Sequence, residues 1–398
     1  MHTSRRTQTL SDATSVPGRS RVWEVDVLRG FALLGILLVN VQIMAGQQVG
    51  PEGELVVSQS DKVVEWLVTA LISAKFYLMF SFLFGYSFTL QRASAERAGA
   101  PFAPRHLRRL ICLFLLGLAH GVLLFSGDVL MVYAVLSLVL FWVRDSAART
   151  LVRAAIWLIV GASACLLAWG MSTVRFAEPL GPQDISSTVN ASVAAWRGDP
   201  GSVVGAHLRV LHDTLGWNVV YSADMLAALL LGLAAGRRRI LADSFRYRAW
   251  LTQIVICCLP IGLAGSVFMA ICRNGPLDAR WYDVGSAVGV LTAPFLSVVY
   301  VCGLLLLLRT GLGRRVGCAL APAGRMALTN YLTQSLVMAL VFTGYGLAWY
   351  GRFGMTVLLL GCFALYAAQL TLSSHLLRHV PYGPAEWLLR TATLARRP

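Results

Sequence analysis

A histidine and an aspartate eight residues apart carry the chemistry that this sequence most strongly indicates. His120 lies in an apolar stretch, and Asp128 follows it after the turn-forming pair Ser126-Gly127. A carboxylate beside an imidazole orients the ring and stabilises the imidazolium that forms when the ring takes up a proton, so the pair could act as a general base. The structural alternative is a packed histidine and an aspartate that caps the next helix. The sequence leaves contact between the two side chains open, because eight residues around a turn can point them apart.

Arginines near the predicted helix ends could hold an anionic ligand. Arg29 stands three residues after Asp26, and Arg325 precedes a polar run in a later apolar stretch. The planar guanidinium binds phosphate through paired hydrogen bonds, so we expect Arg29, Arg108, Arg109 and Arg325 to meet at one cytoplasmic opening. The alternative for Arg29 is a simple ion pair with Asp26 on one helix face.

Several strongly polar side chains lie inside apolar stretches, where their burial in lipid is costly and often marks a functional site. They could line a substrate path, or they could serve as polar contacts between helices. For Lys75 a further alternative is that the ammonium reaches the headgroup region at the outer surface. The predicted path residues are Asn40, Lys75, Asn330, Tyr331 and Gln334, and Asp224 is an isolated further candidate.

Ten apolar stretches position these residues. About 20 apolar residues are needed to cross the hydrocarbon core as a helix. We therefore predict an all-α, polytopic membrane bundle of about ten transmembrane helices. The long stretch 63–90 is expected to start along the outer interface and to begin its crossing near Lys75. The predicted spans are 27–45, 63–90, 107–125, 129–143, 151–171, 216–236, 250–272, 284–308, 326–349 and 353–375.

The basic residues alternate between many and few in successive connections. Of the 34 Lys and Arg residues, 26 fall in one set of segments, seven in the other, and Lys75 lies within a span. Because cytoplasmic loops carry the excess of positive charge, both termini are predicted to be cytoplasmic, and the protein is expected to cross the cell membrane several times.

Composition agrees with a membrane location. Hydrophobic residues make up 57% of the 398 residues and charged residues 13%. The net charge of +15 comes mostly from short arginine clusters beside the spans, which suits contact with anionic lipid and gives no reason to expect nucleic acid. The eight cysteines lie in or beside apolar stretches without a C-x-x-C pair, so we expect neither a structural disulfide nor a metal site.

The predicted organisation is a single membrane domain over residues 26–390, flanked by a disordered cytoplasmic tail over 1–25 and a short cytoplasmic tail over 391–398. The longest connection, 172–215, is assigned to the extracytoplasmic side. It contains one amphipathic stretch near 203–211 and could cap a site on the outer face. The glycine pair Gly117 and Gly121 is interpreted as a close helix contact.

Short motifs spread over most of the chain carry a family resemblance. They are the segments 26–35 with Asn40, 75–76, 80–85, 108–110 with His120, 127–130, 324–331 and 383–390. In these segments the chain resembles the YeiB-like family of bacterial membrane proteins, which is grouped with transmembrane acyltransferases such as heparan-alpha-glucosaminide N-acetyltransferase. The resemblance implies a location in the bacterial cytoplasmic membrane and acyl transfer from cytoplasmic acyl-CoA, as a co-substrate and not a bound cofactor, to a glycan, lipid or secondary-metabolite acceptor. In that activity His120 and Asp128 would supply the base, and the four arginines would hold the CoA phosphates.

A transporter or exporter of a small or hydrophobic molecule is the alternative. The two predicted halves, spans one to five and six to ten, would have opposite orientations, as in transporters with inverted repeats, but the sequence shows no convincing pair of matching broken spans. A transporter predicts pseudo-symmetric halves with broken helices. An acyltransferase predicts one cleft with His120 reachable from outside and an arginine-lined mouth on the cytoplasmic side. The sequence does not decide the acyl group, the acceptor or the oligomeric state.

Overall fold

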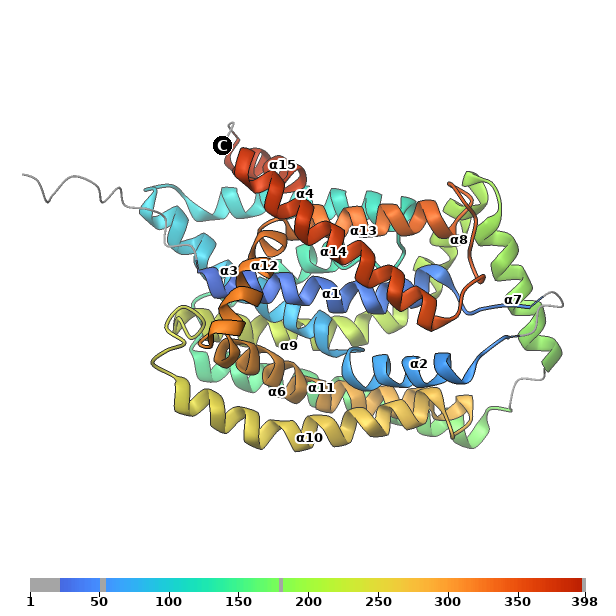
Figure 1. Cartoon of the computed structure of the whole chain (residues 1–398). Helices are drawn as coiled ribbons and strands as arrows, with labels where there is room; N and C mark the ends of the chain where they lie inside the picture. Colours follow the sequence, from blue (N-terminus) through green and yellow to red (C-terminus); the bar gives the residue numbers. More distant parts are fainter. Residues whose placement is uncertain (1–21, 51–54, 179–181, 396–398) are drawn as a thin grey trace, which may run out of the picture.

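A computed structural model describes residues 22–50, 55–178 and 182–395. These residues form helices joined by short connections (Figure 1). The helices are α1 (Trp23–Ala45), α2 (Gln59–Leu71), α3 (Lys75–Arg97), α4 (Phe102–Leu123), α5 (Leu130–Trp142), α6 (Ala148–Phe176), α7 (Pro182–Arg197), α8 (Pro200–Asp213), α9 (Leu215–Arg237), α10 (Arg248–Asn274), the 3₁₀ turn η1 (Ala279–Trp281), α11 (Tyr282–Leu307), α12 (Gly311–Arg325), α13 (Ala327–Phe342), α14 (Met355–His379) and α15 (Pro384–Leu394).

The long helices run lengthwise through one bundle, with α1 at its centre (Figure 1). The start of α1, the ends of α3 and α9, and the helix α15 lie at one end of the bundle, which we call the arginine-rich end. Helices α7 and α8 lie across the opposite end (Figure 1).

Eight of the ten predicted spans are helices long and apolar enough to cross a membrane. They correspond to α1, α2 with α3, α4, α6, α9, α10, α11 and α14, which are helices of a membrane protein. The predicted spans 129–143 and 326–349 contain the shorter apolar helices α5 and α13, of 13 and 16 residues. At 1.5 Å per residue these two fall short of the roughly 30 Å hydrocarbon core, so the exact number of crossings stays a prediction.

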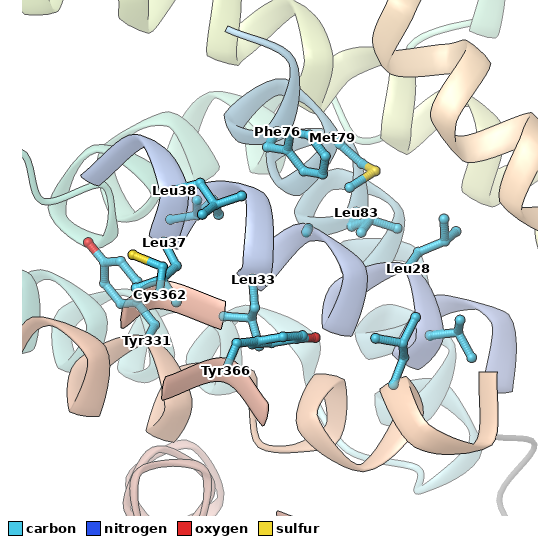
Figure 2. Packing of buried hydrophobic residues seen from close by; sticks show 14 of the residues in the cluster. Leu28, Leu33, Leu37, Leu38, Phe76, Met79, Leu83, Tyr331, Cys362 and Tyr366 are labelled. Atoms are coloured by element: carbon cyan, nitrogen blue, oxygen red, sulfur yellow. The ribbon is translucent and has the colours of Figure 1, made fainter. Parts of the chain in front are cut away.

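Apolar side chains on every face of α1 pack into the core of the bundle. Leu33 and Leu37 are almost fully buried and lie against Tyr366, Tyr331 and Cys362 on α13 and α14, as Figure 2 shows. Between helices in lipid, such packing stabilises mainly through van der Waals contact, because lipid is as apolar as the side chains themselves.

Two glycines bring α1 and α12 into backbone contact. A Cβ on Gly30 would collide with the carbonyl oxygen of Leu320, and a Cβ on Gly324 would collide with that of Asp26. Only glycine at these positions allows the two helices to cross so closely. The crossing places Arg29 and Arg325, each next to one of these glycines in sequence, at the same end of the bundle.

The break between α2 and α3 differs from the expectation for residues 63–90. Helix α3 does begin at Lys75, but α2 packs against α10 and α14 along the bundle and does not lie on the outer interface (Figure 1). Lys75 therefore has no exposed surface, and its Nζ donates to the carbonyl oxygen of Thr69 at 3.1 Å. The alternative that this ammonium reaches the headgroup region does not hold, because the helix break keeps it among the C-terminal carbonyls of α2.

Three predicted boundaries also shift. Residues 23–25 of the expected N-terminal tail are the first turn of α1, and the predicted tail residues 1–21 lie outside the described part of the chain. The expected loop 172–215 contains α7 and α8, and α8 covers the amphipathic stretch 203–211. Residues 391–394 of the expected C-terminal tail belong to α15.

Candidate functional site

His120 and Asp128 are in direct contact inside the bundle. Nδ1 of His120 lies 2.9 Å from Oδ1 of Asp128, and the two side chains are 1% and 2% exposed. His120 is in the last turn of α4, and Asp128 lies just before α5. The other carboxylate oxygen of Asp128 accepts from the backbone N–H of Met131 at 3.0 Å. The carboxylate thus orients the imidazole and also stabilises the first turn of α5.

Gly117 explains why the turn brings the two side chains together. A Cβ at this position would lie 2.6 Å from Oδ2 of Asp128 and would also collide with the backbone N of Met131. At Gly121, one helical turn further on, a Cβ would lie at an ordinary 3.7 Å from Cβ of Asp128. Of the two glycines predicted to serve helix packing, Gly117 therefore allows the close approach of α4 and α5 and makes room for the carboxylate beside the histidine, whereas the space at Gly121 does not require a glycine.

The hydrogen bonds define which nitrogen of His120 could act as a base. A carboxylate only accepts hydrogen bonds, so Nδ1 of the neutral ring carries the proton and Nε2 carries the lone pair. Nε2 is buried and has no hydrogen-bond partner among the described residues. This arrangement leaves a basic nitrogen available to a substrate that enters the site.

Tyr331 on α13 completes a buried triad with this pair. Its hydroxyl donates to Oδ1 of Asp128 at 3.3 Å, and its ring centre lies 5.0 Å from that of His120. Glu386 of α15 fixes the start of α13, because its carboxylate accepts from the backbone N–H groups of Leu328 and Thr329 at 2.7 and 3.1 Å. An acidic side chain at a helix N-terminus is stabilised by the helix dipole.

A second histidine, His207 of α8, covers the opposite side of the site. Its Nδ1 accepts from the backbone N–H of Ser126 at 3.2 Å. Trp196 of α7 packs edge-on against its ring, and the two ring centres are 4.7 Å apart. Burial, with a smaller contribution from nearby His120, lowers the pKa of His207 to about 4. His207 is therefore neutral at physiological pH, with its proton on Nε2, which is buried and without a partner in the described part of the chain.

The helices that carry His207 are tied to the bundle at a second point. Nε of Arg197 donates to the carbonyl oxygen of Tyr350 at 2.7 Å, and the N–H of Gly344 donates to the carbonyl oxygen of Trp196 at 2.9 Å. Helices α7 and α8 are thereby held against the connection between α13 and α14. Sequence analysis missed His207, and its only signal was the amphipathic pattern of α8.

A cavity of about 540 Å³ leads from the arginine-rich end toward Tyr331. It lies between α1, α3, α4, α13 and α15, and on α3 its wall extends from Arg97 to Phe80, which is about 25 Å of helix. Apolar and aromatic side chains such as Phe84 and Leu113 line the inner part. Tyr331 lies in its wall together with Val129 and Leu130, which directly follow Asp128 in sequence.

Among the residues that the structure describes, six arginines line this cavity together with two carboxylates, those of Asp26 and Glu386. The predicted residues Arg29, Arg109 and Arg325 are among them, and sequence analysis missed the other three. Arg29 donates to Ser87 and lies 3.6 Å from Asp26, so it pairs with this aspartate while still facing the cavity. The six are Arg29, Arg97, Arg105, Arg109, Arg325 and Arg390.

The structure does not bring Arg108 to this group. Its side chain is exposed, and its Nε donates to the carbonyl oxygen of Pro104 at 3.2 Å on its own helix. Arg108 does not line the cavity, whereas its neighbour Arg109 does.

The predicted path residues other than Tyr331 lie elsewhere. Nδ2 of Asn330 donates to Ser373 at 3.0 Å, and Gln334 donates to Gln369 at 2.8 Å, so both face α14 as polar contacts between helices. Lys75 is at the α2–α3 break. Asn40 is partly exposed on α1 and, like Lys75, does not line this cavity.

Comparison with known proteins places the chain among relatives that match nearly all of its length. It is 30% identical to the uncharacterized protein YxaH of Bacillus subtilis over 94% of both chains, and 27% identical to the uncharacterized protein YeiB of Escherichia coli over 93% of this chain and 95% of the relative. An uncharacterized 39.9 kDa protein from Bacillus acidopullulyticus is 29% identical over 95% of both chains. Residues 235–396 match a family model described as a protein of unknown function, DUF418. The chain therefore belongs to the YeiB-like family.

Proposed function

We propose that the protein is a membrane acyltransferase that takes an acyl group from acyl-CoA and transfers it to a hydroxyl or amine. The observation that carries the proposal is the position of Tyr331. Its side chain lines the arginine-rich cavity and also contacts both His120 and Asp128. The arginine-lined cavity thus extends to a residue that contacts the proposed base.

The charge and shape of the cavity suit CoA. The six arginines would bind the phosphates of the nucleotide part through charge-assisted hydrogen bonds. The apolar part between α3 and α4 would take the pantetheine arm and bring the thioester to Tyr331. We propose that the arginine-rich end faces the cytoplasm, where acyl-CoA is made, because positive charge favours that side.

In the proposed reaction, Nε2 of His120 accepts the proton of the acceptor hydroxyl while the oxygen attacks the thioester carbonyl carbon. Asp128 stabilises the imidazolium that forms. The tetrahedral intermediate then collapses, the carbon–sulfur bond breaks, and His120 returns the proton to the leaving thiolate. The products are an acyl ester of the acceptor and free CoA, so atoms and charge balance.

His207 would serve the acceptor. As part of α8, it lies at the end of the bundle opposite the arginines. Its Nε2–H could donate to the acceptor oxygen. The acceptor would enter from this end, so donor and acceptor would meet at His120 from opposite sides. A glycan, lipid or secondary metabolite fits the proposal equally.

The test is a transfer assay on the purified protein in lipid nanodiscs. The protein is incubated with acyl-labelled acetyl-CoA and longer acyl-CoAs and with an extract of the cells that produce it. The proposal predicts label in a covalent product together with stoichiometric release of free CoA thiol. Absence of both, under conditions where CoA binds, would contradict it.

A transporter is the second candidate, favoured by the discontinuous helices. One break separates α2 from α3 beside the buried Lys75, and another separates α12 from α13 at Met326. Broken helices with buried polar groups are common in transporters. A transporter would move a labelled compound across a proteoliposome membrane unchanged, whereas an acyltransferase would alter it covalently.

A further inference from the structure

A second cavity, of about 650 Å³, lies on the other side of α3. It is bounded by α3, α6, α9, α10 and α11. Leu78 and Phe82 of α3 line it, whereas Leu83 and Phe84 of the same helix line the first cavity. The two cavities are therefore separated by α3, and the second plays no part in the proposed transfer reaction.

The walls of this cavity are mostly apolar, and the arginines that line it are concentrated at one end. Arg149 and Arg153 of α6 and Arg238 after α9 line it at the arginine-rich end. All three are exposed, and none forms an ion pair within the described residues. Trp250, which is 46% exposed, lines the same part. Tryptophan prefers the level of the lipid headgroups, so it marks this end of the cavity as interfacial.

The length of the apolar part matches one membrane leaflet. Asp224, which lines the cavity, precedes Arg238 by 14 residues along α9, about 20 Å of helix. One leaflet contributes about 15 Å of hydrocarbon. An acyl chain that starts at the arginines would therefore end before Asp224. The carboxyl of Asp224 is fully buried and accepts from the hydroxyl of Tyr77 at 2.7 Å.

We propose that this second cavity binds an anionic phospholipid, with an acyl chain between α9 and α10 and its phosphate at Arg149, Arg153 and Arg238. Guanidinium groups bind phosphate with paired hydrogen bonds, and in the described part of the chain these three form no ion pair with a carboxylate that would compete for the phosphate. A zwitterionic lipid would fit the apolar part equally but would gain less from the three arginines. The bound lipid would hold α6, α9 and α10 together at their arginine-rich ends.

The test is native mass spectrometry of the delipidated, purified protein with an equimolar mixture of phosphatidylglycerol and phosphatidylcholine. The wild type is expected to retain one phosphatidylglycerol in preference, by about tenfold. The triple variant Arg149→Gln, Arg153→Gln, Arg238→Gln is expected to lose this preference. The matched control Arg246→Gln, Arg314→Gln, Arg315→Gln removes three exposed arginines that line neither cavity and is expected to keep it.

A cavity-filling variant distinguishes a bound chain from headgroup attraction alone. Ala234 is nearly buried in the cavity wall, so Ala234→Phe is expected to reduce retention while the three arginines remain. Two results would overturn the proposal and would mean adventitious surface lipid only. One is an equal loss of the phosphatidylglycerol preference in the two arginine variants, and the other is full retention of the lipid by a folded Ala234→Phe protein. The arginine variants change only exposed side chains, so they decide the matter even if Ala234→Phe does not fold.

Discussion

Nδ1 of His120 donates to Oδ1 of Asp128 across a tight turn between two helices, at 2.9 Å and almost without solvent exposure. This contact fixes the tautomer of the histidine and leaves the lone pair of Nε2 available. Tyr331 links the pair to a cavity lined with arginines, and His207 covers it from the other side.

Replacing Asp128 by Asn should lower the transfer rate about 10- to 100-fold. The amide keeps the shape but loses the charge that stabilises the imidazolium, and its single oxygen cannot accept from both His120 and Met131. Steady-state kinetics should show the loss mainly in kcat, with little change in KM for acyl-CoA. An unchanged kcat would mean that the carboxylate serves only to cap α5.

Gly117→Ala should impair transfer much more than Gly121→Ala. The added methyl group would collide with Asp128 and Met131 in the first case, whereas in the second it finds ordinary contact distance. Both variants should reach the membrane and elute as a single species, because each adds only one methyl group. Equal activities of the two variants would show that the spacing of α4 and α5 does not position the base.

Arg29→Ala and Arg109→Ala should each weaken CoA binding about tenfold, which corresponds to the loss of a charge-assisted hydrogen bond. Arg108→Ala is the matched control, since this exposed arginine adjoins Arg109 but does not line the cavity. Its Kd for CoA, measured by titration calorimetry, should stay within about twofold of the wild type. A similar loss in all three variants would indicate general electrostatic attraction and no defined phosphate site.

The docking of α8 should weaken as the pH falls from about 6.5 to 4. The pKa of His207 is about 4 in the folded protein, below its ordinary value of 6.5, so a displaced α8 binds the proton more readily. Stability rises with pH wherever the open state binds more protons, and by this relation about 2 kcal/mol is lost at pH 5. Hydrogen exchange in α8, corrected for the intrinsic pH dependence, should report the opening.

His207→Gln provides the control for this pH dependence. Glutamine cannot be protonated in this range. The opening of α8, measured by exchange that is corrected for its intrinsic pH dependence, should therefore become independent of pH between 6.5 and 4. A wild-type α8 that is equally protected at both pH values would contradict the assignment of a neutral, buried His207.

The sequence predicted the helices well because long apolar stretches with arginine-rich connections leave few alternatives to membrane-crossing helices. It could not decide between neighbouring arginines. Successive residues on a helix point about 100° apart, so Arg109 faces the cavity and Arg108 faces outward, and only the packing of α4 determines which is which.

The remaining differences have the same tertiary origin. Asn330 and Gln334 were predicted to line the path, but the helix face that they share meets α14 and not the cavity. His207 could not be assigned from the sequence, since the residues next to it in the chain do not indicate that α8 packs against α4. Lys75 was predicted to line the substrate path, but the break after α2 holds it against the carbonyl oxygen of Thr69 and away from the arginine-rich cavity.

The most direct test of the central claim is the transfer rate of His120→Ala in nanodiscs, measured with acyl-labelled acyl-CoA and the acceptor found in the cell extract. Loss of a general base typically lowers the rate about 10²–10⁴-fold, and we expect a loss in this range with CoA binding unchanged, because His120 does not line the arginine-rich cavity. Transfer at the wild-type rate by the folded variant would contradict the assignment of His120 as the base.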